Sequence, residues 1–198
     1  MLTLSTPLLL AVVCVALAGL AASRRMSAGR WLAVAVFSVY LVGVAHFVLL
    51  PLRLDSMAAE QVGPIDLGRL IELRPFFLSG TEVMPTSQAL LNILLTVPFG
   101  FGLPFVVGLR GRDILAVGIL FSIGIELAQL MVDALYLALP TWSVDINDVL
   151  LNSLGIALGY GAFRATSALY AATIGRLPVR RGPWAHFHDT MMRSERAR

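Results

Sequence analysis

The stretch SVDINDVLLNSLGIALGYGAF, residues 143–163, begins as a polar loop and continues as an apolar run of membrane-spanning character. Asp145, Asp148 and Asn152 are spaced three and four residues apart, which places them on one face of an α-helix. Gly155 and Gly159 continue this face, and a Gly-x-x-x-Gly pair lets a second helix approach closely. The stretch therefore predicts a helix that packs tightly in a bundle and carries polar groups at its start.

The whole chain has the composition of an integral membrane protein. Of its 198 residues, 58% are hydrophobic and 14% are charged, whereas soluble domains have about 25% charged residues. A membrane span needs about 20 mainly apolar residues. Five runs meet this length, at 4–22, 31–50, 89–109, 114–132 and 149–170. The sequence therefore predicts an all-α, polytopic membrane bundle with about five transmembrane helices.

The first run, 4–22, has two interpretations, a signal peptide or a retained helix. No positive charge precedes it, and Arg24 and Arg25 follow it, so we expect a retained helix. The single cysteine, Cys14, lies in this run. One cysteine excludes an intrachain disulfide and argues against a cysteine-based metal site.

The arginines predict the orientation of the bundle. All 15 basic residues are Arg, and most lie between the first two runs, between the third and fourth, and after the fifth. Because cytoplasmic loops are rich in basic residues, we expect the N-terminus outside and the C-terminus in the cytoplasm. Loops 51–88 and 133–148 then face outward. The isoelectric point is about 9.6. Because the arginines flank the apolar runs, membrane topology explains this basic excess, and no nucleic-acid partner is expected.

Three segments make up the predicted organisation. Residues 1–30 form the first transmembrane helix and a basic loop, 31–170 form the membrane domain with its outer loop 51–88, and 171–198 form a basic cytoplasmic tail. Within the outer loop, 64–73 is expected to form a short surface helix. Pro178, Gly182 and Pro183 argue against a long helix in the tail, which we expect to lie loosely on the anionic leaflet.

Two histidines in this tail raise the question of a metal. His186 and His188 are two lone histidines on a basic tail. We expect them to be solvated, and no metal site is predicted.

A second polar stripe runs along the fourth predicted span. Ser122, Glu126, Gln129 and Asp133 follow at four, three and four residues, and Glu126 lies about two turns inside the outer end. A carboxylate at this depth is costly and needs a partner in the bundle interior. Glu126 has two possible roles. It either supports helix packing, through a hydrogen bond or as a neutral acid, or it takes part in a functional site. We favour function.

Polar residues of three spans share one depth. Given the predicted topology, the outer half of the bilayer holds Asn92, Glu126, Gln129, Asp148 and Asn152. Asp145 is expected to be the N-cap of the last helix, which does not explain the deeper polar residues. The shared depth predicts one acidic pocket open to the outside. Arg74 in the outer loop is the expected counter-charge, or a clamp for a carboxylate or phosphate.

The order and spacing of these motifs resemble the VanZ-like family over about residues 32–165. The matching pieces are Asn92-x5-Pro98-Phe99-Gly100, Ile125-Glu126-x2-Gln129 and Asp145-Ile146-Asn147-Asp148-x3-Asn152-x2-Gly155-x3-Gly159-Tyr160. Arg74-Pro75-Phe76 stands where the family usually has Asn-hydrophobic-Pro-Phe. Trp142 stands where the family often has an Arg, so a contact with an anionic ligand is altered here, and Arg74 is its expected substitute.

The resemblance implies a multi-pass protein of the bacterial cell (inner) membrane. The family's namesake raises resistance to the lipoglycopeptide teicoplanin, which implies a role in antibiotic resistance or maintenance of the cell envelope. The expected partners are membrane lipids and a lipid-linked envelope precursor or lipoglycopeptide. The cofactor and the oligomeric state are left open.

Four functions are compatible with these features. A binding protein would hold its ligand with Arg74, Asn92, Gln129, Asp145 and Asn152. An enzyme would use Glu126 as general acid or base, together with Asp148, and Asp145 and Asp148 could hold a divalent cation. An ion-coupled transporter would use Glu126 as a proton relay, and a structural bundle would use the polar stripes for packing. We favour the binding protein.

Overall fold

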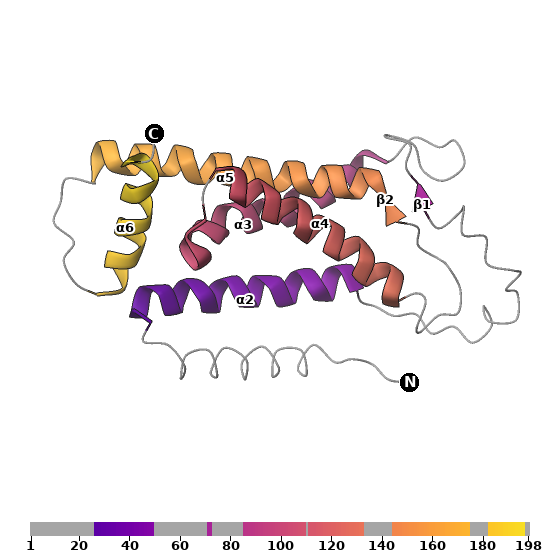
Figure 1. The fold of residues 1–198 in the computed structure, drawn as a ribbon, viewed down its shortest axis with the longest axis horizontal. Helices are drawn as coiled ribbons and strands as arrows, with labels where there is room; N and C mark the ends of the chain where they lie inside the picture. The colour runs from indigo at the N-terminus through magenta and orange to yellow at the C-terminus, as the bar shows by residue number, and fades with distance from the viewer. Residues whose placement is uncertain are drawn as a thin grey trace, which may run out of the picture.

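The computed structural model describes residues 26–49, 71–72, 85–109, 111–132, 144–174 and 182–196. These residues form five helices and two two-residue strands (Figure 1). In chain order the elements are α2 (Ala28–Leu49), β1 (Ile71–Glu72), α3 (Thr86–Val107), α4 (Arg112–Val132), β2 (Val144–Asp145), α5 (Ile146–Thr173) and α6 (Pro183–Arg196). The predicted all-α membrane bundle is confirmed.

Three of the helices are long and apolar enough to cross a membrane. Their apolar stretches are Ala28–Val48, Thr86–Val107 and Arg112–Met131, which correspond to the second, third and fourth predicted runs. Large apolar side chains cover their outer faces, for example Val39, Leu94 and Leu120, which are 63%, 64% and 68% exposed. Such a surface suits lipid and not water. The fifth run lies within α5, and the first lies outside the described residues, so the number of five spans and their orientation stay predictions.

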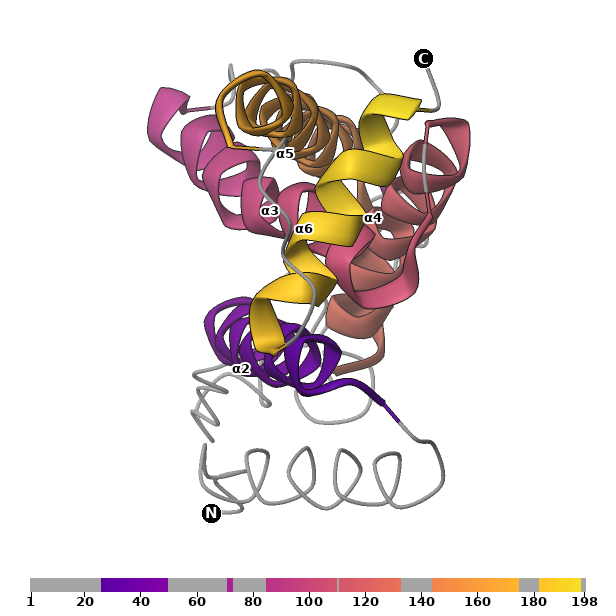
Figure 2. The same cartoon turned by 90° about the vertical axis from the view of Figure 1, so that its left-hand side faces the viewer.

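Helices α3, α4 and α6 pack on α5. The most extensive contact is between α3 and α5, α4 also packs on α5, and α2 packs on α3. The rings of Phe99 in α3 and Phe121 in α4 are stacked with centroids 4.0 Å apart, and Ile156 of α5 is fully buried beside them. Figures 1 and 2 show α6 crossing one end of the bundle from α5 to α2.

Glycines allow α3 and α5 to touch through their backbones. A Cβ atom added at Gly155 would meet the carbonyl of Ile93, and one at Gly159 would meet the carbonyl of Val97. From the other side, a Cβ at Gly100 would lie 2.9 Å from the backbone nitrogen of Tyr160. The predicted role of the Gly-x-x-x-Gly pair in close helix approach is confirmed.

The prediction for the tail is wrong. Instead of a loose segment, α6 is a 14-residue helix that begins at Pro183. Proline is well suited to the first turn of a helix, where its missing N–H group would have no intrahelical acceptor. The apolar side chains of Phe187 and Met191 pack against a buried cluster that includes Phe105 and Phe163, which holds the helix on the bundle.

The two histidines of α6 are half-buried instead of solvated. His186 Nε2 lies 2.7 Å from the carbonyl oxygen of Phe105, and His188 Nδ1 lies 2.9 Å from the hydroxyl of Tyr170. Both histidines therefore connect α6 to other helices.

The surface helix predicted at 64–73 is wrong where the structure describes it. Ile71 and Glu72 form strand β1, which pairs in parallel with β2, with Ile71 opposite Val144 and Glu72 opposite Asp145. The rest of this stretch lies outside the described residues. The partner strand is distant in sequence, so local helical periodicity did not indicate this pairing.

The tight contact between α3 and α5 predicts a strong difference between two neighbouring glycines. Gly159→Ala should lower the free energy of unfolding by about 1–3 kcal/mol, because its methyl group collides with backbone atoms of α3. Gly161→Ala, two residues further along α5, enters open space and should leave stability unchanged or slightly raised. Thermal unfolding of the purified protein in detergent measures both. Equal effects would contradict this account of the contact.

Candidate functional site

Carboxylates from two helices meet at the end of the bundle where β1 and β2 pair. Glu126 comes from α4, while Asp145 and Asp148 come from the start of α5. Asn92 of α3 joins them. We call these four residues the acidic site.

Glu126 is buried and bonded to the start of α5. Only 3% of its surface is exposed, and its Oε2 accepts the backbone N–H of Asp145 at 3.2 Å. This contact holds the C-terminal half of α4 against Asp145, the residue that precedes α5. A buried carboxylate is thus placed inside the bundle, as the sequence predicted, with a partner on a neighbouring element.

Asp145 is the N-cap of α5. Its backbone is extended, with φ −107° and ψ 119°, and its Oδ1 accepts the backbone N–H of Asn147 at 2.8 Å and the side-chain amide of Asn147 at 2.7 Å. Such a bond satisfies one of the four N–H groups that have no acceptor within the helix. The predicted capping role is confirmed.

Asp148 connects α5 to α3. Its carboxylate accepts a hydrogen bond from the Asn92 side-chain amide and another from the Gln88 side chain. The predicted proximity of Asn92 and Asp148 is present in the structure. Gln88 is a site residue that the sequence analysis missed, although it lies four residues before Asn92 and hence on the same helix face.

A buried hydroxyl closes the inner side of the acidic site. Thr96 is fully buried, and its Oγ1 lies 2.9 Å from the carbonyl oxygen of Asn152 in α5 and 2.9 Å from that of Asn92 in its own helix. Asn152 is 3% exposed and takes part in this bond through its backbone. Asn152, which the sequence analysis placed on the same helix face as Asp145 and Asp148, therefore lies at the contact between α3 and α5.

Gln129 is directed elsewhere. Its Nε2 lies 3.5 Å from the carbonyl oxygen of Val48 in α2, which is a long hydrogen bond. Of the other predicted residues, Arg74, Asp133 and Trp142 lie outside the described residues. The bonds join Asn92 to Asp148 and Glu126 to the backbone of Asp145, whereas Gln129 contacts a different helix. A single pocket shared by all of these residues stays a prediction.

The acidic site contains three carboxyl groups, which are hydrogen-bond acceptors and carry negative charge when ionised. The charges of Asp145 and Asp148 both act on Glu126. Ionised carboxylates only accept hydrogen bonds, and each offers about four lone-pair positions, more than the contacts above use at Glu126. Among the residues that the structure describes, no three His, Cys, Asp or Glu side chains are grouped so as to hold a metal ion. The arrangement suits a ligand that donates hydrogen bonds.

Comparison with known proteins gives one match. A family model described as VanZ/LLP1 matches residues 37–169, about two-thirds of the chain. The matched range contains all four residues of the acidic site. No curated protein and no solved structure matches.

The bond between α3 and α5 predicts that Asn92 and Asp148 can be exchanged. Asn92→Asp places two half-buried carboxylates in contact and should lower stability by about 1–3 kcal/mol, because neither then has the other as a donor and their charges repel. Asp148→Asn in the same chain restores one amide and one carboxylate and should recover most of this loss. Thermal unfolding of both single variants and the double variant gives the coupling. Purely additive effects would show that the two side chains do not bond.

Proposed function

Because the chain belongs to the VanZ/LLP1 family, we propose that it is a bacterial cell-membrane protein whose acidic site binds the polar headgroup of an envelope ligand. The ligand is a lipid-linked envelope precursor or a lipoglycopeptide of the teicoplanin type. The consequence for the cell is resistance to such a compound or maintenance of the envelope. In the predicted topology the acidic site faces the outside, where both ligands are found.

The observation that carries this proposal is a buried carboxyl group that its structural contact does not require. Glu126 accepts one backbone N–H group, that of Asp145. The neutral side-chain oxygen of a glutamine would accept the same bond. A charged or protonated carboxyl group in a membrane bundle is costly, and such groups usually mark functional sites. The carboxyl group at 126 is therefore better explained by a ligand than by packing.

The chemistry of the acidic site indicates which part of the ligand it contacts. Carboxylates attract hydroxyl, amide and ammonium donors and repel phosphate. Sugar and peptide groups of a precursor or lipoglycopeptide offer such donors. Arg74, two residues after β1 in the sequence and outside the described residues, is the residue that we propose for a phosphate or carboxylate of the ligand.

A second candidate function is an enzyme that acts on the same headgroup. Its support is the burial of Glu126, which is 3% exposed, beside two further carboxylates. Neighbouring carboxyl groups favour protonation of one of them, which suits a general acid or base. Glu126 would then transfer the proton, and Asp148 would orient the substrate. Chemical change of the precursor upon incubation with the protein separates an enzyme from a binding protein.

We expect the charge of the acidic site, and not its shape, to determine activity. A teicoplanin-sensitive bacterial host would express wild type, Glu126→Gln, Asp148→Asn or the control Asp113→Asn. Asp113 is an exposed carboxylate at the opposite end of α4. Wild type and the control should raise the inhibitory concentration of teicoplanin, whereas Glu126→Gln and Asp148→Asn should not. The affinity of these two variants for teicoplanin should fall about tenfold or more, as expected for lost hydrogen bonds to a charged group.

The comparison requires equal membrane levels and equal melting temperatures. Teicoplanin binding to the purified variants, measured in nanodiscs, gives a readout that does not depend on the host. If both site variants bind and protect like wild type, the acidic site is not the ligand site. If they only melt at lower temperature, the carboxyl groups serve packing.

A further inference from the structure

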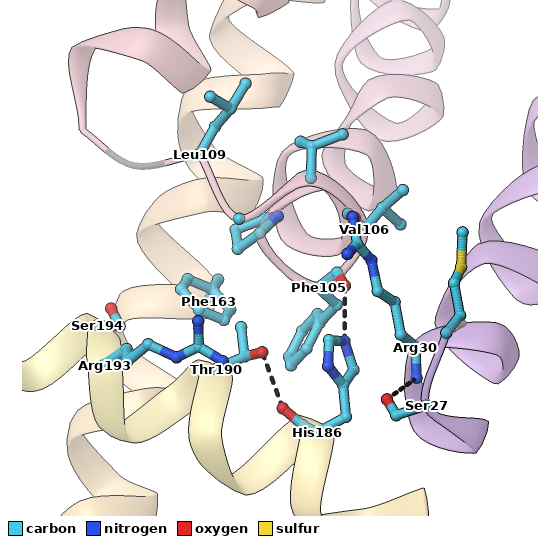
Figure 3. Close-up of a pocket in the computed structure, with 14 residues that line it drawn as sticks. Ser27, Arg30, Phe105, Val106, Leu109, Phe163, His186, Thr190, Arg193 and Ser194 are labelled. Carbon is cyan, nitrogen blue, oxygen red and sulfur yellow. Dashed lines mark hydrogen bonds between the residues drawn. The ribbon is translucent and has the colours of Figure 1, made fainter. Parts of the chain in front are cut away.

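A second site lies at the opposite end of the bundle, beneath α6. A cavity of about 330 Å³ is lined there by the start of α2, the end of α3, α5 and α6 (Figure 3). Binding pockets for small ligands begin at about this volume. In α3, Asn92 of the acidic site and Phe105 of this cavity are thirteen residues apart, or about 20 Å along the helix. The two sites are therefore separate.

The cavity has a basic lining. Arg30 of α2 and His186 and Arg193 of α6 contribute to its wall. Among the residues that the structure describes, none of its lining side chains is acidic. Hydroxyl groups of Ser27, Thr190 and Ser194 add further polar atoms, and all three are lining residues shown in Figure 3. This combination favours an anion with several oxygen atoms.

Arg30 and His186 also have a structural role, which does not exhaust the donors of Arg30. Arg30 Nη2 donates to the carbonyl oxygen of Val106 at 3.2 Å, and His186 Nε2 lies 2.7 Å from that of Phe105. These carbonyls belong to the last turn of α3, where carbonyls have no intrahelical donor. A guanidinium has five N–H donors in a planar fork, and this contact uses one of those of Arg30.

The positions of the walls are fixed by close packing. A Cβ atom added at Gly29 of α2 would lie 2.7 Å from the Cβ of His186 in α6. The backbone N–H of Arg30 lies 3.3 Å from Ser27 Oγ at the start of α2, and the positive end of a helix dipole favours an anion there. The cavity is thus held by the same contacts that attach α6 to the bundle.

The other wall of the cavity is apolar. Pro104, Phe105 and Phe163 line it beside the basic side chains. A phosphate on the arginines and a hydrocarbon portion along this wall would satisfy both surfaces. The predicted orientation places this end at the cytoplasmic leaflet, whose anionic lipids bind to basic pockets between membrane helices.

We propose that the cavity between α2, α3 and α6 binds the phosphate of an anionic phospholipid headgroup, which Arg30 and Arg193 contact. The bound lipid connects the start of α2 to α6 and thereby stabilises the inner end of the bundle. This site is independent of the proposed function of the acidic site.

The test is lipid-induced stabilisation of the purified, delipidated full chain in detergent. The melting temperature is measured with increasing phosphatidylglycerol, with phosphatidylcholine of the same chain length and with inorganic phosphate. The variants are Arg30→Gln, Arg193→Gln and the control Arg112→Gln. Arg112 is exposed at the first residue of α4 and does not line the cavity. All three variants remove the same charge.

Phosphatidylglycerol should stabilise wild type and Arg112→Gln equally, with an apparent affinity about tenfold weaker in Arg30→Gln and in Arg193→Gln. Phosphatidylcholine and inorganic phosphate should have little effect. Each shift in melting temperature is measured relative to the same variant without lipid. If Arg30→Gln folds poorly, Arg193→Gln still tests the site, because it keeps the bond from Arg30 to Val106.

Two results would overturn the proposal. Equal lipid affinity in Arg193→Gln and Arg112→Gln would indicate general attraction to a basic surface. An arginine-dependent effect of inorganic phosphate as large as that of the lipid would assign the cavity to a soluble phosphate compound.

Discussion

Close backbone contact between α3 and α5 is the constraint on which the acidic site depends. Gly155 and Gly159 leave no side chain between α5 and the carbonyls of Ile93 and Val97. Only at this separation does the short Thr96 side chain reach the backbone of α5. A rotation of either helix by one residue, about 100°, would move a side chain into the contact and carry the polar groups away from each other. The geometry of the acidic site thus follows from the absence of side chains at Gly155 and Gly159, about two and three turns after Asp148 in α5.

Sequence reasoning succeeded where the signal is local or periodic. The capping role of Asp145 follows from residue type and position, and the approach at Gly155 and Gly159 follows from spacing. It failed where three-dimensional packing decides. Gln129 lies three residues after Glu126, on a similar helix face, but the small angular difference between them directs it to α2. The pairing of β1 with β2 depends on a partner distant in sequence, and Pro183 fits either a break or a first turn.

The two ends of the bundle carry side chains of opposite charge, and α3 and α5 run in the same direction between them. Their N-termini lie together at one end, where partial positive charge attracts Asp145 and Asp148. The C-terminus of α3 lies at the other end, where Arg30 and His186 contact its last carbonyls. At each end, the dipoles of α3 and α5 favour the sign of the side chains named above. The same signs make one end suitable for hydrogen-bond donors and the other for anions.

Helix dipoles and caps account for less charge than the acidic site contains. Asp145 alone supplies the side-chain cap of α5, and each additional carboxylate repels it. Where α3 needs only a hydrogen bond to α5, the chain uses the neutral amides of Gln88 and Asn92. A bundle selected for packing alone would gain by a neutral side chain at Glu126 too, because its contact with the backbone of Asp145 does not need a charge. The carboxyl group at this position is consistent with selection for a partner from outside the chain.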